Sequence, residues 1–119
     1  MAVAQLKAVT FKGLKELMNG KKNMKIGHNT AAADCGNLVG IKYHNYPIAV
    51  LDRGNSMIID HFGWVTVTTS GRLHQIVSAN YPGAGVNIRK GMMVYTAPSG
   101  ATHDVNEGLA IDPSGEVKE

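Results

Sequence analysis

Apolar residues near the start of the chain recur at helical spacing. Phe11, Leu14 and Met18 follow one another at intervals of three and four residues, which places them on one face of a helix. Thr10 can cap the beginning of this helix, and Gly20 can stop it after its last apolar position. The pattern therefore predicts a helix between Thr10 and Gly20.

Residues 20–37 show little periodicity. Gly, Asn, Ala and Asp dominate this stretch, with one short apolar run from Met24 to Ile26. We predict a long connection here, in which Asn29-Thr30 forms a turn or cap, and connections of this length are often functional.

The pattern changes to strands after residue 37. Leu38–Tyr43 alternates between apolar and polar positions, and His44-Asn45 then makes a tight turn into a second strand, Tyr46–Leu51. The cluster Asp52–Ser56 is typical of a turn, and Met57–Asp60 is predicted to be the returning strand.

A second helix is predicted after a further alternating stretch. Val65–Thr68 alternates as a strand does, and Thr69 or Ser70 then caps a helix that ends near Asn80, before Pro82. The apolar stripe of this helix consists of Leu73, Ile76 and Val77.

Two short strands complete the predicted core. Gly85–Ile88 and Met92–Tyr95 are joined by a hairpin loop, Arg89–Gly91. From Thr96 onward Pro, Gly, Ser, Thr and acidic residues prevail, and we predict a mobile tail because so few apolar residues cannot offset the ordering entropy.

These elements predict an α+β fold, a meandering antiparallel β-sheet with one helix packed on a face. An N-terminal helix and a flexible acidic C-terminal tail are added to it. The predicted domain organisation is a basic helical segment over residues 1–23, a core domain over 24–95, and an acidic tail over 96–119.

The chain has 119 residues, one cysteine and a formal net charge of +3. This length suits one domain, and a single cysteine cannot form an internal disulfide, so a reducing compartment fits best. The longest aliphatic stretch, Ile48–Leu51, is far shorter than the roughly 20 residues that a membrane helix needs. We therefore expect a soluble protein that does not enter membranes.

Charge is distributed unevenly along the chain. Residues 1–25 carry six lysines and one acid, Glu16, whereas residues 96–119 carry five acids and one lysine, Lys118. A basic head can bind nucleic acid or another acidic surface, and an acidic tail can screen it. Alternatively, both regions are solvated surface with no partner.

Candidate catalytic and metal-binding residues do not form a recognised motif. His28, Cys35 and His44 are seven and nine positions apart, which matches no structural zinc site. Asp60 and His61 follow a strand and point to opposite faces. We therefore expect no enzymatic activity, no metal and no cofactor.

Trp64 is the one tryptophan, and it follows a glycine. Its ring could anchor a helix to the sheet, or it could stack on a nucleic-acid base while nearby cations hold phosphate. Four tyrosines could share the stacking role: Tyr43, Tyr46, Tyr81 and Tyr95. The candidate residues for binding nucleic acid or another partner are Lys21, Lys22, Lys25, Trp64, Arg72, Arg89 and Lys90.

Three motifs resemble a group of small tailed-bacteriophage proteins. Tyr43–Ala49 resembles a YHG-x-PIA strand of that group, Gly63–Thr69 resembles its GGW-x-T-x-TT strand, and Arg72-Leu73 opens its R-hydrophobic-N helix. The resemblance covers about residues 38–95. This chain departs from the outline at Asn45, Phe62 and His74, where the group has glycine, glycine and asparagine.

The resemblance implies a phage setting and no particular reaction. Our first hypothesis is a non-enzymatic phage accessory protein in the host cytoplasm that binds nucleic acid or an acidic host protein surface, in host takeover or anti-defence. The alternative is a structural or decoration protein of the virion that multimerises in the capsid or tail. Under either hypothesis a homo-oligomer is an option.

Overall fold

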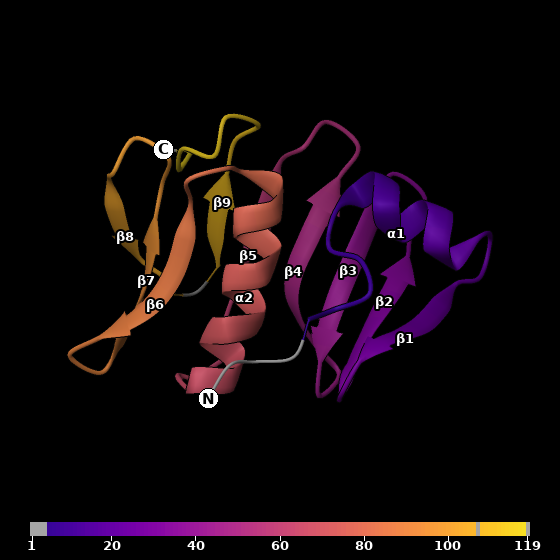
Figure 1. Ribbon diagram of the computed structural model, residues 1–119, viewed down its shortest axis with the longest axis horizontal. Helices are drawn as coiled ribbons and strands as arrows, with labels where there is room; N and C mark the ends of the chain where they lie inside the picture. The colour runs from indigo at the N-terminus through magenta and orange to yellow at the C-terminus, as the bar shows by residue number, and fades with distance from the viewer. Residues whose placement is uncertain (1–4, 107, 119) are drawn as a thin grey trace.

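The computed structural model describes residues 5–106 and 108–118, which fold into two helices and two antiparallel sheets (Figure 1). The large sheet has the strand order β1-β2-β3-β4-β5-β9, and the small sheet has the order β6-β7-β8. The elements in chain order are α1 (Phe11–Met18), β1 (Asn23–Gly27), β2 (Thr30–Asp34), β3 (Leu38–Tyr43), β4 (Tyr46–Asp52), β5 (Met57–Ile59), α2 (Val67–Asn80), β6 (Gly85–Arg89), β7 (Met92–Thr96), β8 (Thr102–Asp104) and β9 (Leu109–Ile111).

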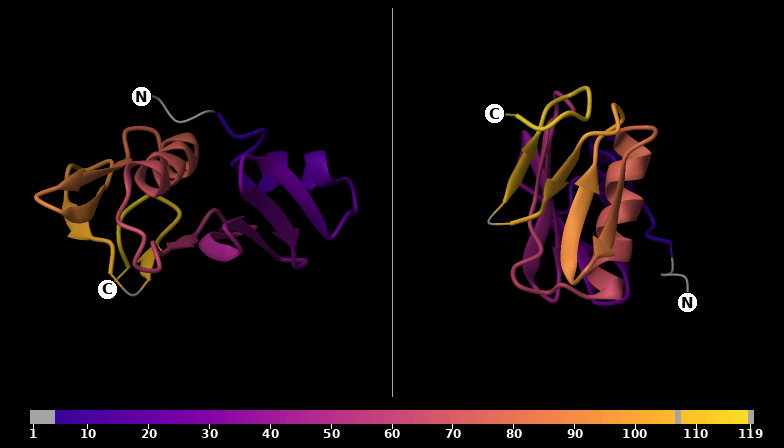
Figure 2. Two further views of the ribbon diagram at one scale, coloured as in Figure 1. Left: turned by 90° about the horizontal axis from the view of Figure 1, so that it is seen from below. Right: turned by 90° about the vertical axis from the view of Figure 1, so that its left-hand side faces the viewer.

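The predicted α+β class is confirmed, and β1 to β5 form the expected antiparallel meander. Both helices lie on the same face of the large sheet, as Figures 1 and 2 show. α1 packs against β2 and β3, whereas α2 packs mainly against β6 and also reaches β4. The core fills the space between the helices and this inner face of the large sheet.

The first helix forms where the apolar spacing predicted it. The Thr10 hydroxyl oxygen accepts a hydrogen bond from the Gly13 amide at 3.0 Å, which caps the first turn. Asn19 ends the helix with a left-handed φ of 46°. Leu14 and Met18 are fully buried against the sheet.

The predicted long connection over residues 20–37 is wrong, because this stretch contains the hairpin of β1 and β2. Ile26 and Ala32 have no exposed surface and belong to the core under α1. The turn at Asn29 is confirmed, with a φ of 52°. Alanine has low strand propensity, so Ala31–Ala33 carries no strand signal, and packing against α1 decides its structure.

The second helix begins earlier than predicted, so the strand expected over Val65–Thr68 does not form. Thr66 is the N-cap, and its hydroxyl oxygen accepts a hydrogen bond from the Thr69 amide at 3.2 Å. Several threonines in succession offer equivalent caps, so the local sequence does not choose among them. The buried stripe of Leu73, Ile76 and Val77 is confirmed.

The predicted flexible tail is also wrong, because residues 102–104 and 109–111 form strands β8 and β9. Val105 and Ile111 have no exposed surface and complete the core. The acids of this segment support its turns: Asp112 accepts hydrogen bonds from Ser114, and Glu116 accepts them from Ser99. Few apolar residues suffice here because the rest of the core is already formed around them.

Two core tyrosines make the stability of the fold sensitive to alkaline pH. The Tyr81 hydroxyl donates to the Asn55 carbonyl oxygen at 2.7 Å, and the Tyr95 hydroxyl donates to the Gly115 carbonyl oxygen. Burial raises the pKa of Tyr81 to about 12 and also raises the pKa of Tyr95. The folded protein therefore retains these protons where the unfolded chain, with a tyrosine pKa of about 10, releases them.

We expect the free energy of unfolding to fall as pH rises from about 10 towards 12, by up to about 1.4 kcal/mol per pH unit for each tyrosine. Urea unfolding at pH 8, 10 and 11 measures this change. Tyr81→Phe is less stable at pH 8, since the hydrogen bond to Asn55 is lost, but loses less stability between pH 10 and 11 than the parent does. Equal stability of the parent at pH 8 and 11 would contradict the prediction.

Candidate nucleic-acid interface

Five aromatic side chains gather at one end of the large sheet, where β3 turns into β4 and a loop leads towards α2. The His44 ring stacks on the Trp64 ring at 5.7 Å between centroids, with an interplanar angle of 18°. The centroid of the Tyr46 ring lies 5.5 Å from that of Phe62 and 6.2 Å from that of Trp64. The ring centroids of Tyr43 and His44 are 4.4 Å apart. We call Tyr43, His44, Tyr46, Phe62 and Trp64 the aromatic cluster.

Local hydrogen bonds shape the loop that presents Phe62 and Trp64. The Asp60 carboxylate accepts from the Phe62 amide at 2.9 Å, and the His61 Nδ1 atom accepts from the Gly63 amide at 2.9 Å. Phe62 and Gly63 have φ values of 51° and 83°, so the chain turns sharply between them. This turn directs two large rings towards the β3–β4 turn instead of into the core.

The aromatic cluster is open to solvent. Trp64 and Phe62 are each 42% exposed, and Tyr46 is 44% exposed. Trp64 therefore lies outside the core, and its ring contacts His44 and Tyr46 at the β3–β4 turn. Of the other tyrosines considered for stacking, Tyr81 and Tyr95 are buried in the core.

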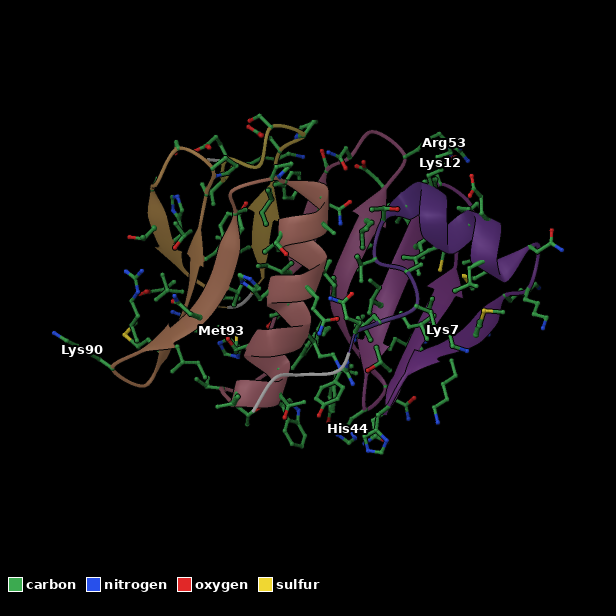
Figure 3. The ribbon with its side chains drawn as sticks, viewed as in Figure 1. Lys7, Lys12, His44, Arg53, Lys90 and Met93 are labelled. Carbon is green, nitrogen blue, oxygen red and sulfur yellow. The ribbon has the colours of Figure 1, made fainter. Side chains whose placement is uncertain are left out.

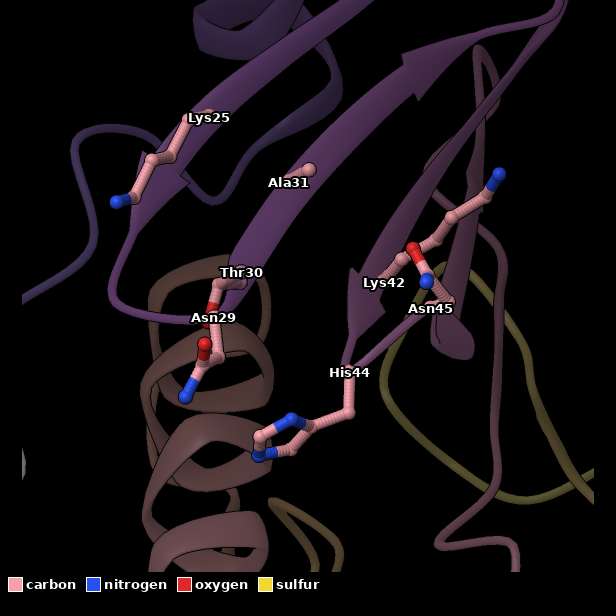
Figure 4. Close-up of a pocket in the computed structure, with 7 residues that line it drawn as sticks. All are labelled: Lys25, Asn29, Thr30, Ala31, Lys42, His44 and Asn45. Atoms are coloured by element: carbon pink, nitrogen blue, oxygen red, sulfur yellow. The ribbon is translucent and has the colours of Figure 1, made fainter.

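An open cavity of about 420 Å³ adjoins the aromatic cluster (Figure 4). Ala31 of β2 pairs with Lys25 of β1 on one side and with Lys42 of β3 on the other. The two lysines are therefore separated by one small side chain. In Figure 4 the two lysines extend to opposite sides, and the His44 ring points towards the side of Asn29. His44 thus belongs both to the aromatic cluster and to the cavity, whose lining is Lys25, Asn29, Thr30, Ala31, Lys42, His44 and Asn45.

Arg72 lies inside the molecule, only 3% exposed, and does not face this cavity as a phosphate ligand would. Its guanidinium donates to the His28 carbonyl oxygen at 3.1 Å, which ties α2 to the β1–β2 turn. The Thr30 hydroxyl donates to the same oxygen at 2.8 Å. Arg72 therefore positions the turn that carries Asn29 at the cavity.

The remaining candidate cations fall into two separate groups. Lys21, Lys22 and Lys25 are exposed along β1 and the residues that lead into it, and the exposed Lys7 lies beside the same strand through its amide hydrogen bond to Ile26 (Figure 3). We call Lys7, Lys21, Lys22 and Lys25 the lysine edge. Arg89 and Lys90 lie at the β6–β7 turn, and Figure 3 shows Lys90 at one end of the long axis, far from His44.

Lys15 is engaged in the fold and does not join the lysine edge. Its ammonium group lies 2.9 Å from the Asp34 carboxylate and also donates to the Gly36 carbonyl oxygen. The hydrogen bond from Lys15, together with one from the Gly36 amide, lowers the pKa of Asp34. This pair joins α1 to the end of β2.

His44, Phe62, Lys42 and the two turn asparagines were not predicted to belong to the site. Asn29, His44 and Asn45 all have positive φ values, which mark the β1–β2 and β3–β4 turns that line the cavity. The sequence can indicate where the turns lie, but it does not indicate which turns come together in space, because that depends on the order of the strands in the sheet. Within residues 5–106 and 108–118, no group of three or more His, Cys, Asp or Glu side chains is arranged to hold a metal ion.

Fold and site together define a small α+β protein with an exposed surface of aromatic rings beside lysines. No helix in the described ranges has the length and apolar character needed to span a membrane. The family model of the Kyanoviridae Gp96 protein matches residues 8–111, most of the chain. The chain therefore belongs to this phage protein family. Neither a curated protein nor a solved structure matches it.

Proposed function

We propose that this phage protein acts without catalysis, by binding single-stranded nucleic acid in the host cytoplasm. The observation that carries the proposal is the half-exposed aromatic cluster, which shares His44 with a cavity lined by Lys25 and Lys42. Exposed rings beside cations are the usual components of a single-strand site, since unpaired bases stack on the rings while the cations neutralise phosphates.

The lysine edge gives the phosphate backbone a path away from the aromatic cluster. Lys25 lies at the cavity, and Lys22 precedes it by three residues, about 10 Å along an extended strand. A strand of nucleic acid stacked at Trp64 can therefore follow β1 past exposed ammonium groups. In a duplex the bases already stack on one another, so the aromatic cluster favours a single strand.

We expect the acidic C-terminal residues not to screen this edge. Asp112 and Glu116 are hydrogen-bonded within their own segment. In Figure 1 that segment lies beyond α2, at the side of the molecule away from β1. The lysine edge is thus open to an external anion.

The test is a titration of mixed-sequence single- and double-stranded DNA and RNA at several salt concentrations. We expect single strands to bind more tightly, with an affinity that falls as salt rises because phosphate contacts release counterions. Lys22→Gln with Lys25→Gln is expected to reduce the magnitude of the log-log salt slope by up to about 1.4, since each single-strand phosphate contact contributes about 0.7.

Arg89→Gln with Lys90→Gln is the matched control, because it removes the same charge at the far end of the molecule. This control is expected to leave the slope unchanged. If the two double variants had equal salt slopes, the lysine edge would not be part of the nucleic-acid interface. No binding at low salt would contradict the proposal and favour a protein partner with an acidic surface.

The second candidate function, a virion structural protein, is favoured by a different observation. One face of the large sheet carries apolar side chains and faces away from both helices. A protein that multimerises needs such a face.

A further inference from the structure

We propose that two copies of this chain associate through the outer face of the large sheet, the face opposite α1 and α2. The inference rests on the sheet alone, although Lys42 also lines the cavity of the proposed nucleic-acid site, so a dimer and a bound strand would compete for this side chain. It begins from the strand register, which aligns one residue from each of five adjacent strands in a single row. The apolar row consists of Ala33, Gly40, Val50, Ile58 and Ala110.

The composition of this row is unusual for a solvent-facing sheet surface. Antiparallel sheets with one covered face normally place polar residues on the other face. Here Ile58 is 52% exposed, and Leu38, in the next outward position on β3, is 45% exposed. Among the described residues no helix lies on this face, and a Cβ atom added at Gly40 would meet no other atom within 4 Å.

The two large side chains of the row, Val50 and Ile58, lie next to each other at its middle. Ala33 and Gly40 at one end of the row and Ala110 at the other have small side chains or none, so the row is low at both ends. A second sheet can pack on such a face at about 10 Å, with Ile58 and Val50 filling the space between the two layers.

Opposite charges flank the row, and they favour a second copy of this chain as the partner that binds there. Lys42 is the outward residue of β3 on one side of the row, and Asp52 of β4, which pairs with Leu38, is outward on the other side. Rotation by 180° about an axis that runs along the row lays the apolar row of one copy on that of the other. The same rotation reverses the strand direction, which brings Lys42 of each copy to the side where its partner carries Asp52.

The outer face is therefore complementary to itself in charge, and its apolar row meets an identical row, as an isologous two-fold interface requires. A second copy satisfies the charges at both ends of the row at once. Any other partner would need to match the same alternation of cation, apolar row and anion.

The test is the mass of the full-length protein by sedimentation equilibrium across a concentration series, without nucleic acid. We expect a reversible dimer of twice 12.7 kDa. Ile58→Lys is expected to raise the dissociation constant at least tenfold, because two ammonium groups would be buried in the apolar row. Val67→Lys is the matched control, since Val67 is 70% exposed at the start of α2, away from the outer face.

Two further variants test the charges. Lys42→Gln and Asp52→Asn each weaken the dimer, and the double variant is expected to be no weaker than either single variant, because the two residues form one interaction. Asparagine keeps an oxygen that can accept the hydrogen bond from the Ser56 amide, so the turn is preserved. Circular dichroism confirms that each variant is folded.

A monomer at the highest soluble concentration would overturn the proposal, as would equal dissociation by Ile58→Lys and Val67→Lys. This measurement contains no nucleic acid, so its outcome is read separately from the binding titration. Because Lys42 is shared, the binding titration is repeated with Ile58→Lys: if this dissociated variant also binds no nucleic acid, the proposed function is contradicted while the dimer of the parent still supports this inference.

Discussion

Removal of residues 97–119 is expected to abolish cooperative folding. The truncation deletes β8 and β9, so β5 loses one of its two neighbours in the large sheet and Tyr95 loses its acceptor, the Gly115 carbonyl oxygen. It also removes Val105 and Ile111, which have no exposed surface. Thermal unfolding followed by circular dichroism should show a broad change without a clear midpoint.

A point variant measures how much this segment contributes to the stability of the fold without deleting any backbone. Ile111→Ala is expected to lower the free energy of unfolding by about 2–5 kcal/mol, the usual cost of a cavity in a packed core. Lys118→Ala is the control in the same segment, since Lys118 is exposed, and should change stability by less than about 0.5 kcal/mol. A truncated chain that unfolds cooperatively near the parent midpoint would show that the segment is dispensable.

Trp64→Ala is expected to weaken single-strand binding about 5- to 150-fold with little change in stability. Stacking of one base on an aromatic ring contributes about 1–3 kcal/mol, and every 1.4 kcal/mol corresponds to a factor of ten. Because Trp64 is 42% exposed, its loss leaves the core intact. Fluorescence anisotropy of a labelled oligonucleotide gives the affinity, and urea unfolding gives the stability.

Trp64→Phe keeps a ring in place and should retain most of the affinity. Met92→Ala is the matched control, because Met92 is also exposed, at 44%, and lies next to the β6–β7 turn, away from the aromatic cluster. If Trp64→Ala binds as the parent does while Lys22→Gln with Lys25→Gln binds weakly, the interaction is electrostatic and involves no stacking.

Elements with complete local signals were predicted correctly from the sequence. α1 has a capping threonine, apolar spacing and a stop, and β3 to β5 alternate between turn-forming residues. In these segments the backbone preference and the burial pattern agree, so neighbouring residues are sufficient to determine the element. The clustered lysines are also visible in the sequence, and the structure shows that they are exposed.

Elements whose stability comes from distant partners were missed. The alanines of β2 have little strand preference, and they form a strand because they lie under α1 and between β1 and β3. In the same way β9 is too short to be stable alone, and pairing with β5 together with burial of Ile111 holds it. Such contacts join residues far apart in the chain, so no local pattern reports them.

The candidate site follows the same division. The sequence by itself determined the residue types available for binding: one tryptophan, several tyrosines and a run of lysines near the start. Only the tertiary structure decided that Trp64 meets His44 at an exposed turn, that Arg72 is buried, and that Arg89 and Lys90 lie elsewhere. Strand order and register bring residues together across the sheet, and these depend on packing of the whole chain.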